Sequence, residues 1–358
     1  MNRAARATID SSALRANLAA VRRAAPDSRV MAVIKANAYG HGIVPVARAL
    51  QESDAFGVAR MEEAAAIRGA GLDGRIVLLE GVFHAEQLDL AAALEAELVI
   101  HSPEQLEMLE QYPGPHRFRT WLKVDTGMNR LGFPPDGARD LSRRLESCTA
   151  VADSPRLMTH LARADATADP ATQNQIRMFS EATGDLQGSR SIANSAGVLA
   201  WPDSHANWVR PGIMLYGVSP FEDRTGPELG LTPVMTLASE LIAVKMVAAG
   251  QAVGYGGTWI ASSPTRIGVA AIGYGDGYTR HLGSGAPVLV AGQMAHLIGR
   301  ISMDLVTIEL KGVEGAKVGD EVLLWGAELP VERLAQAAGT IPYELLCGVT
   351  QRVAMRVT

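Results

Sequence analysis

Apolar and polar positions follow one repeating pattern through the first two thirds of the chain. Residues 30–34 read Val-Met-Ala-Val-Ile, an apolar run without alternation that is typical of a strand buried on both faces. Similar short runs recur at intervals. They predict strands at residues 30–35, 55–59, 76–80, 97–101, 120–124, 156–161, 191–194 and 209–215.

The intervals between these strands carry helical patterns. The predicted helices are residues 61–69, 103–110, 136–145 and 173–183. Near the N-terminus, Asp10-Ser11-Ser12 is typical of a helix cap, and Leu14, Leu18 and Val21 then form one apolar face. About eight strand–helix units predict an α/β fold, a TIM-type (β/α)8 barrel over residues 1–231. A doubly wound open sheet is the alternative, less favoured because no G-x-G-x-x-G motif follows the first strand.

The pattern changes near Leu231-Thr232-Pro233. Beyond this point, β-branched runs are separated by Gly and Pro, which favours a mostly antiparallel β domain over residues 232–358. Its predicted strands are residues 241–247, 265–271, 287–290, 305–310 and 321–324. We predict a single helix in this domain, at residues 330–338.

Composition restricts the class of protein. The chain is 47% hydrophobic and 20% charged with a net charge of −5, which argues against a nucleic-acid partner. Cys148 and Cys347 give neither a disulfide framework nor metal-ligand spacing, so we expect no metal and a reducing compartment. Arginines interrupt every apolar stretch near the N-terminus, and no window is long enough to cross a bilayer. We therefore expect a cytoplasmic protein without a membrane partner.

Chemically active side chains gather where the predicted barrel strands end, and in such barrels the reacting groups lie there. They include Lys35 and Tyr39, residues 123–130 with Lys123 and Arg130, His160 and Asp165, residues 194–197, and residues 210–213. Lys35 has an apolar surrounding that would desolvate its amine, so it could form an imine with an aldehyde. Each residue also has an explanation without a catalytic role: Lys35 could reach solvent, and His160 could be a core histidine whose ring nitrogens are hydrogen-bonded.

An anion cradle is predicted beside this lysine. Ser195-Ala196-Gly197 opens a helix-like stretch, and Gly212 allows close approach of a backbone N–H group. An imine-forming lysine opposite a phosphate cradle suggests pyridoxal 5′-phosphate (PLP). A Schiff-base aldolase acting on a sugar phosphate would carry the same features.

Three Gly-spaced loops of the second domain carry further candidates. They are Val253 to Trp259 with Tyr255, Gly273 to Arg280 with Tyr274, and Gly299 to Asp304 with Arg300. Each could be an ordinary β-turn that uses Gly for its positive φ.

The combined motifs resemble those of bacterial alanine racemases, a family of fold-type III PLP enzymes. The matching blocks are Ala32 to Gly42, Lys123 to Gly132, Thr159-His160, Ala193 to Gly197, Arg210 to Ile213, Gly254 to Gly256, Gly273 to Gly277, and Ser302 to Asp304. They occur in the family's order and extend over essentially the whole chain.

The resemblance implies a homodimer with shared active sites that interconverts L-alanine and D-alanine. Lys35 would hold PLP as an internal aldimine and act as one base, and Tyr255 of the other subunit would act as the second. Arg210 would face the pyridine nitrogen, a weak electron sink that suits racemisation. The remaining cofactor contacts implied are Tyr39, His160, Asn194, Ser195, Gly212, Ile213 and Tyr343.

Substrate contacts also follow from the resemblance. Arg130 and the Met303 backbone N–H would bind the substrate carboxylate. Lys123 would be N-carboxylated and orient Arg130, or it would remain unmodified and pair with Asp125. The entrance would be lined by Asp165, Tyr274, Arg280, Arg300 and Asp304.

Three other functions have less support from the sequence. A basic amino-acid decarboxylase on a similar scaffold lacks support because no His-x-Gly-Ser-Gly loop or preceding Gly-rich triplet occurs. A non-catalytic cofactor-binding barrel would not require the residues after Pro233. A broad-specificity racemase would resemble exported proteins. Whether serine is accepted, and whether the role is cell-wall biosynthesis or D-alanine catabolism, stays open.

Overall fold

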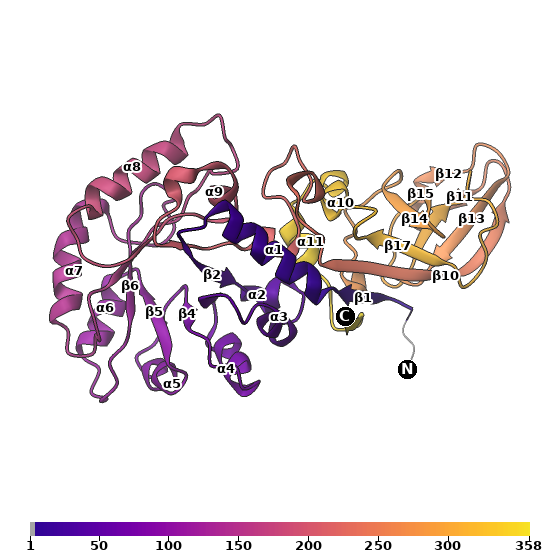
Figure 1. Ribbon diagram of the computed structural model, residues 1–358. Coiled ribbons are helices and arrows are strands. Elements are labelled where there is room, and N and C mark those ends of the chain that lie inside the picture. Colours follow the sequence, from indigo (N-terminus) through magenta and orange to yellow (C-terminus); the bar gives the residue numbers. More distant parts are fainter. Residues whose placement is uncertain (1–3) are drawn as a thin grey trace. The chain divides into compact units, whose positions relative to one another are not determined.

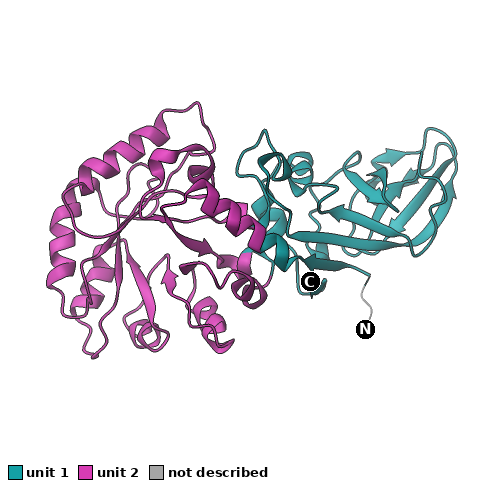
Figure 2. Cartoon of the chain, viewed as in Figure 1, with its two compact units in different colours: residues 1–14, 39–41, 216–358 teal, residues 15–38, 42–215 magenta. Residues whose placement is uncertain are grey.

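The computed structural model describes residues 4–358 (Figure 1). The chain forms two compact units, coloured separately in Figure 2. Unit 1 comprises the described residues up to Leu14, residues 39–41 and residues 216–358, and unit 2 comprises residues 15–38 and 42–215. Within residues 4–358, no helix combines the length and hydropathy needed to cross a membrane.

Unit 2 contains a closed barrel of parallel strands in the order β2 to β9. The strands are β2 (Arg29–Val33), β3 (Ala55–Val58), β4 (Ile76–Leu78), β5 (Ala96–Ile100), β6 (Thr120–Lys123), β7 (Arg156–Met158), β8 (Arg190–Ser191) and β9 (Trp208–Val209). Pairing of Arg29 with Trp208 and of Val30 with Val209 closes the barrel. The predicted (β/α)8 barrel is confirmed, and each predicted strand overlaps an observed one.

Helices follow most of these strands. They are α3 (Ile43–Ala49), α4 (Met61–Gly69), α5 (Gln87–Ala93), α6 (Pro103–Glu110), α7 (Ala138–Ser147), α8 (Ala171–Thr183) and α9 (Ser195–Ala200). The barrel interior is filled by one apolar cluster. Its fully buried members are Met31, Ala55, Val77, Val99, Trp121, Met158 and Trp208.

The first helix, α1 (Ser11–Ala24), begins where its sequence predicts. The Asp10 carboxylate accepts hydrogen bonds from the backbone N–H groups of Ser12 at 2.7 Å and Ala13 at 3.1 Å, which satisfies donors that the first helical turn leaves unpaired. Leu14, Leu18 and Val21 are buried, as the periodicity of the sequence indicates.

Unit 1 contains an eight-stranded sheet in the order β13-β16-β15-β14-β17-β10-β1-β18. Its strands are β1 (Arg6–Ile9), β10 (Met235–Val247), β13 (Thr265–Ala270), β14 (Pro287–Val290), β15 (Gln293–Leu297), β16 (Val306–Glu309), β17 (Glu321–Trp325) and β18 (Ala354–Val357). An additional pairing between β10 and β13 closes six of the strands into a second, antiparallel barrel. The hairpin of β11 (Ala252–Val253) and β12 (Trp259–Ile260) stands apart from the sheet.

Three details of unit 1 differ from the sequence-based expectation. The barrel domain predicted over residues 1–231 is longer than unit 2, which ends at Leu215, so residues 216–231 belong to unit 1. The N-terminal segment also belongs to unit 1, because β1 pairs antiparallel with β10 and parallel with β18. The single helix expected after residue 232 is wrong: α10 (Val331–Ala338) is followed by α11 (Pro342–Cys347), a helix of six residues that starts at a proline.

Candidate active site

The carboxyl ends of the barrel strands present a layer of basic side chains. Side chains two residues apart on a strand point to the same face, so residues that follow the apolar cluster at this spacing also face the barrel interior. Those residues include His101, Lys123, His160 and Arg210, and Lys35 follows Met31 by four positions, just beyond the end of β2. The layer contains no acidic side chain at these positions, so its charge would suit an anionic ligand.

Arg210 is the most deeply buried member of this layer, with 4% of its surface exposed. Its guanidinium donates to Ser191 Oγ at 2.6 Å, to the Thr159 carbonyl at 2.5 Å and to the Ile192 carbonyl at 3.3 Å. Burial lowers the pKa of Arg210 to about 10, so the side chain remains a cation at neutral pH.

His160 is held in one tautomer by Arg210. Its Nδ1 lies 3.2 Å from Arg210 Nη2, and because a guanidinium only donates, Nδ1 must accept and the ring proton resides on Nε2. Burial, followed by the charge of Arg210, lowers the pKa of His160 well below 6.5. The imidazole is therefore neutral at pH 7 and can present an N–H group.

Lys123 is buried among cations. Burial, followed by the positive charges of Arg210, Arg130 and Lys35, lowers the pKa of its amine to about 8. Within residues 4–358, no ion pair joins Lys123 to Asp125, whose Oδ1 instead accepts from three backbone N–H groups in the loop after β6. The structure therefore does not show a direct Lys123–Asp125 pair, and the Asp125 carboxylate acts on Lys123 through its charge, which raises the pKa of the amine. Arg130 is exposed at the end of this loop.

The chain after Lys35 takes an unusual path. Ala36, Asn37, Ala38 and Tyr39 have φ values of 55, 52, 55 and 51°, which makes α2 (Lys35–Tyr39) a left-handed turn in non-glycine residues. Each such residue costs roughly 1–2 kcal/mol. Neighbouring groups hold the turn: Asn37 N–H donates to Glu63, and Asn37 Oδ1 accepts from Ile43 N–H at 2.9 Å. Strain of this kind is stored where side-chain placement matters, here directly after Lys35.

The predicted anion cradle is formed by two segments. Ser195 Oγ accepts from the backbone N–H groups of Gly212 at 2.9 Å and Met214 at 3.3 Å, so its own O–H remains a donor. Asn194 caps α9, because its Oδ1 accepts from Gly197 N–H at 2.9 Å. Ile213 begins η3 (Ile213–Tyr216), and the first N–H groups of a helical turn have no partner inside it. The donors gathered here suit a phosphate.

In unit 1, two tyrosines predicted to contact the same phosphate lie together. The rings of Tyr39 and Tyr343 have centroids 5.8 Å apart, and Tyr39 stacks on Tyr216 at 4.7 Å. Burial raises the pKa of Tyr39 above its ordinary value, so its hydroxyl stays protonated and can donate a hydrogen bond.

The three Gly-rich loops of unit 1 meet. Tyr255 opens η5 (Tyr255–Gly257) between Gly254 and Gly256, both at positive φ, and these glycines lie against Arg300. Tyr274 N–H donates to the Ser302 carbonyl at 3.1 Å, which joins the second loop to the third. The Tyr255 side chain is 69% exposed and Met303 is 52% exposed. Single β-turns would not require this convergence of exposed apolar groups.

The predicted entrance residues fall in both units. Asp165 is exposed in the loop after β7 of unit 2, whereas Arg280 and Asp304 are exposed in unit 1. Arg352, which the sequence did not single out, pairs with Asp304 and lies 3.2 Å from Asp276. Among the described residues, no cluster of His, Cys, Asp and Glu could hold a metal ion.

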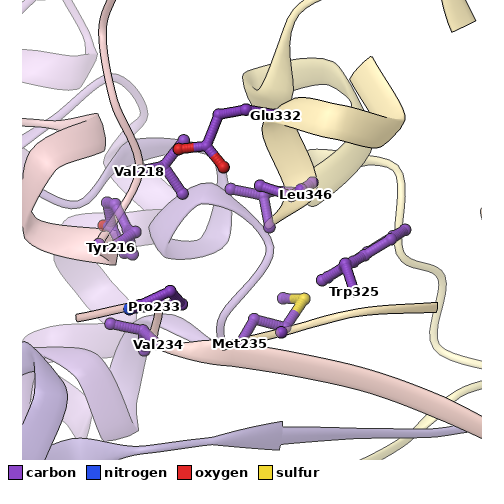
Figure 3. A pocket seen from close by; sticks show the side chains of 11 residues that line it. Tyr216, Val218, Pro233, Val234, Met235, Trp325, Glu332 and Leu346 are labelled. Atoms are coloured by element: carbon purple, nitrogen blue, oxygen red, sulfur yellow. The ribbon is translucent and has the colours of Figure 1, made fainter. Parts of the chain in front are cut away.

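A separate pocket in unit 1 contains none of the predicted site residues (Figure 3). It is lined mainly by apolar side chains, among them Met235, Trp325 and Leu346. The one acid in its wall, Glu332, accepts from the backbone N–H groups of Ser219 and Gly226. The Glu332 carboxylate is therefore engaged in hydrogen bonds to the backbone of the surrounding loops.

Comparison with known proteins identifies the family. Residues 9–220 match the model of the alanine racemase N-terminal domain, and residues 234–357 match that of the C-terminal domain. The chain belongs to the alanine racemase family. It is 51% identical over 353 residues to an alanine racemase of Aeromonas hydrophila, with 99% of each chain covered. A relative from Halorhodospira halophila is also 51% identical, with 99% of this chain and 97% of that one covered.

Solved structures of the family have the same fold. The biosynthetic alanine racemase of Pseudomonas aeruginosa superposes with a TM-score of 0.96 at 46% identity, with both chains fully covered. The alanine racemase of Bartonella henselae, solved with covalently bound pyridoxal phosphate, gives a TM-score of 0.90 at 28% identity, also over both full chains. Together these likenesses extend over both units.

Proposed function

We propose that this protein is a PLP-dependent alanine racemase that interconverts L-alanine and D-alanine. The observation that carries the proposal is the layer of basic side chains around Lys35, in a chain that matches the alanine racemase family over both domains. When bound, PLP supplies an electron-withdrawing ring that makes the α-proton of an amino acid acidic. The protein's task is to hold that ring and to move the proton.

The barrel residues are suited to hold the cofactor. Lys35 would carry it covalently through Nζ, and the donors of Ser195, Gly212 and Ile213 would bind its phosphate together with the hydroxyls of Tyr39 and Tyr343. His160 and Asn194 would complete its surroundings. Arg210 would face the ring nitrogen as a cation, because its pKa of about 10 keeps it protonated. A permanent donor at that nitrogen leaves it unprotonated, which limits charge delocalisation and favours return of the α-proton over side reactions.

Racemisation needs two groups that exchange a proton with opposite faces of the substrate. Lys35 Nζ would serve one face. Tyr255 would serve the other face in the site of a second copy of the chain, and its 69% exposure leaves the phenol accessible for such a role. Because Lys35 and Tyr255 of one site would come from different subunits, the active enzyme would be a homodimer with two shared sites.

Substrate recognition would fall to residues near the mouth of the barrel and on the exposed loops of unit 1. Arg130 and the Met303 backbone N–H would bind the carboxylate of alanine, and N-carboxylated Lys123 would orient Arg130 by its negative charge. Asp165, Tyr274, Arg280, Arg300 and Asp304 would line the entrance and limit the size of the side chain accepted.

The cellular setting is proposed on chemical grounds. Neither Cys148 nor Cys347 forms a disulfide within residues 4–358, which fits a reducing compartment, and we propose that the enzyme acts in the cytoplasm. There it would supply D-alanine for peptidoglycan or take part in its catabolism.

Exchange of the α-proton with deuterium oxide tests these roles. Tyr255→Phe should slow exchange from L-alanine more than from D-alanine, because only one face loses its proton acceptor. Tyr112→Phe makes the same change at the end of α6 and is the matched control, expected to leave both rates unchanged. Equal losses for the two enantiomers with Tyr255→Phe would refute the two-base assignment. A chiral assay against a panel of amino acids would show whether alanine is the preferred substrate.

A further inference from the structure

The opposite end of the barrel carries a second charged layer. Five charged residues each precede a member of the apolar cluster by two positions along the strand. They are Arg29, Arg75, Glu97, Arg119 and Arg156, before Met31, Val77, Val99, Trp121 and Met158. Because side chains two apart share a face, the five form one layer below the apolar core, at the amino ends of the strands.

Glu97 is the only acid among these five side chains, and its oxygens are already engaged. It is 4% exposed at the side chain; Oε1 accepts from Arg75 Nε at 2.7 Å, and Oε2 accepts from Trp121 Nε1 at 2.9 Å. Arg156 Nη1 lies 3.9 Å from Oε2, beyond hydrogen-bond range. This buried nitrogen has no hydrogen-bond partner among residues 4–358.

One of the two outer arginines, Arg29, is held by an aromatic ring. Arg29 lies over the Trp208 ring at 5.6 Å, on the same indole that Arg75 covers at 5.1 Å. Such contacts fix a guanidinium without cancelling its charge. Arg29 and Arg119 are exposed, and neither forms an ion pair within the described part of the chain. A second acid, Asp153, lies 3.6 Å from Arg156 and is half exposed.

The layer therefore holds four guanidinium groups, and among the described residues only Glu97 and Asp153 were found to pair with any of them, which leaves an excess of positive charge. We propose that this layer is a binding site for a phosphate-like oxyanion that carries two negative charges. Guanidinium groups bind such oxyanions through paired N–H donors, and the unpartnered Arg156 Nη1 supplies a donor for one of the oxygens. Burial and the charges of Arg75 and Arg119 lower the pKa of Arg156, which is the cost that a bound anion would relieve.

Occupancy of this site should affect stability more than catalysis, since it lies at the end of the barrel remote from Lys35. A ligand that binds only the folded chain raises its thermal midpoint with concentration until the site is saturated. The site would thus couple the stability of the barrel to the supply of a small oxyanion.

The test uses the holoenzyme, in which the cofactor already fills the phosphate cradle at the other end of the barrel. The thermal midpoint is measured against inorganic phosphate in a zwitterionic buffer, with potassium chloride at matched ionic strength as reference. The expected result is a saturable rise with phosphate above that with chloride. Arg119→Gln should weaken the apparent affinity by about tenfold, the loss expected for one hydrogen bond between charged groups.

Two further variants make the test decisive. Arg177→Gln removes the same charge from an exposed position on α8, 69% exposed at the side chain, and should bind phosphate as the wild type does. Arg29→Gln provides a second exposed change in the layer if Arg119→Gln fails to fold. The proposal is overturned if phosphate and chloride act alike on the wild type, or if Arg177→Gln weakens binding as much as the variants in the layer.

Discussion

Carbon dioxide should add to the amine of Lys123 and to no other lysine of this protein. The sequence has five lysines, of which Lys245, Lys311 and Lys317 are exposed and Lys35 is assigned to the cofactor. Carbon dioxide reacts with an unprotonated amine, and the product carries a negative charge. Lys123 is buried beside Arg210 and Arg130, so the structure favours both the unprotonated reactant and the anionic product.

The size of the effect follows from the pKa of Lys123, which falls from 10.5 to about 8. At pH 7 this raises the unprotonated fraction from about 0.03% to about 10%, roughly 300-fold. The unfolded chain binds this proton more tightly, so stability of the unmodified protein rises between about pH 8 and 10.5. Below pH 8 the cost of the buried charge, about 3 kcal/mol, is fully present.

Carbon-13 NMR of the holoenzyme in labelled bicarbonate measures the modification directly. We expect one carbamate resonance in the wild type. At a fixed pressure of carbon dioxide, this resonance should weaken as the pH falls below 8, because the amine becomes protonated. Lys123→Arg should abolish the resonance, and the matched variant Lys245→Arg should retain it. A wild-type spectrum without a carbamate at pH 8, or a resonance that survives Lys123→Arg, would refute the reasoning.

Two stability predictions concern the ends of the barrel. Ser195→Ala removes the acceptor of the Gly212 and Met214 N–H groups, and each unsatisfied buried donor costs about 1–3 kcal/mol, so urea unfolding should show a loss of roughly 2–6 kcal/mol. A loss below about 0.5 kcal/mol would mean that water replaces the hydroxyl without penalty. Glu97→Gln breaks a buried ion pair and should lower the free energy of unfolding by about 3–5 kcal/mol in the same assay. An unchanged denaturation midpoint would show that the Glu97 carboxylate does not stabilise the amino-terminal end of the barrel.

Local sequence signals were sufficient for the barrel. Its strands are short apolar runs. Its helices at 61–69 and 103–110 have the predicted bounds, the first from an Ala-rich periodicity flanked by charges and the second from the Ser102 cap followed by Pro103. The position of β1 could not be predicted in this way. Residues 6–9 carry only four residues of weak pattern, and their place is decided by pairing with strands more than two hundred residues away.

Site residues could be predicted where the neighbouring sequence marks them. The prediction was incomplete where a residue's role depends on the three-dimensional arrangement. Lys35 and Lys123 were predicted because they lie at the ends of apolar runs, and Arg210 because the strand predicted at residues 209–215 carries it beside Gly212. His101 was missed because it stands before an obvious helix cap, Ser102, although its alternation with Val99 signals that it faces the barrel interior. The left-handed turn after Lys35 has no signal beyond a small-residue segment, since alanine rarely adopts positive φ.

Mixing two inactive variants tests most directly whether each site is built from two chains. Lys35→Ala and Tyr255→Phe subunits, carrying different tags, are unfolded, mixed in equal amounts and refolded with PLP. Half of the dimers would then be hybrids with one intact site each, so activity should reach about a quarter of the wild-type value. Tag-purified hybrids that remain as inactive as the two parents would contradict a catalytic tyrosine donated by the neighbouring subunit.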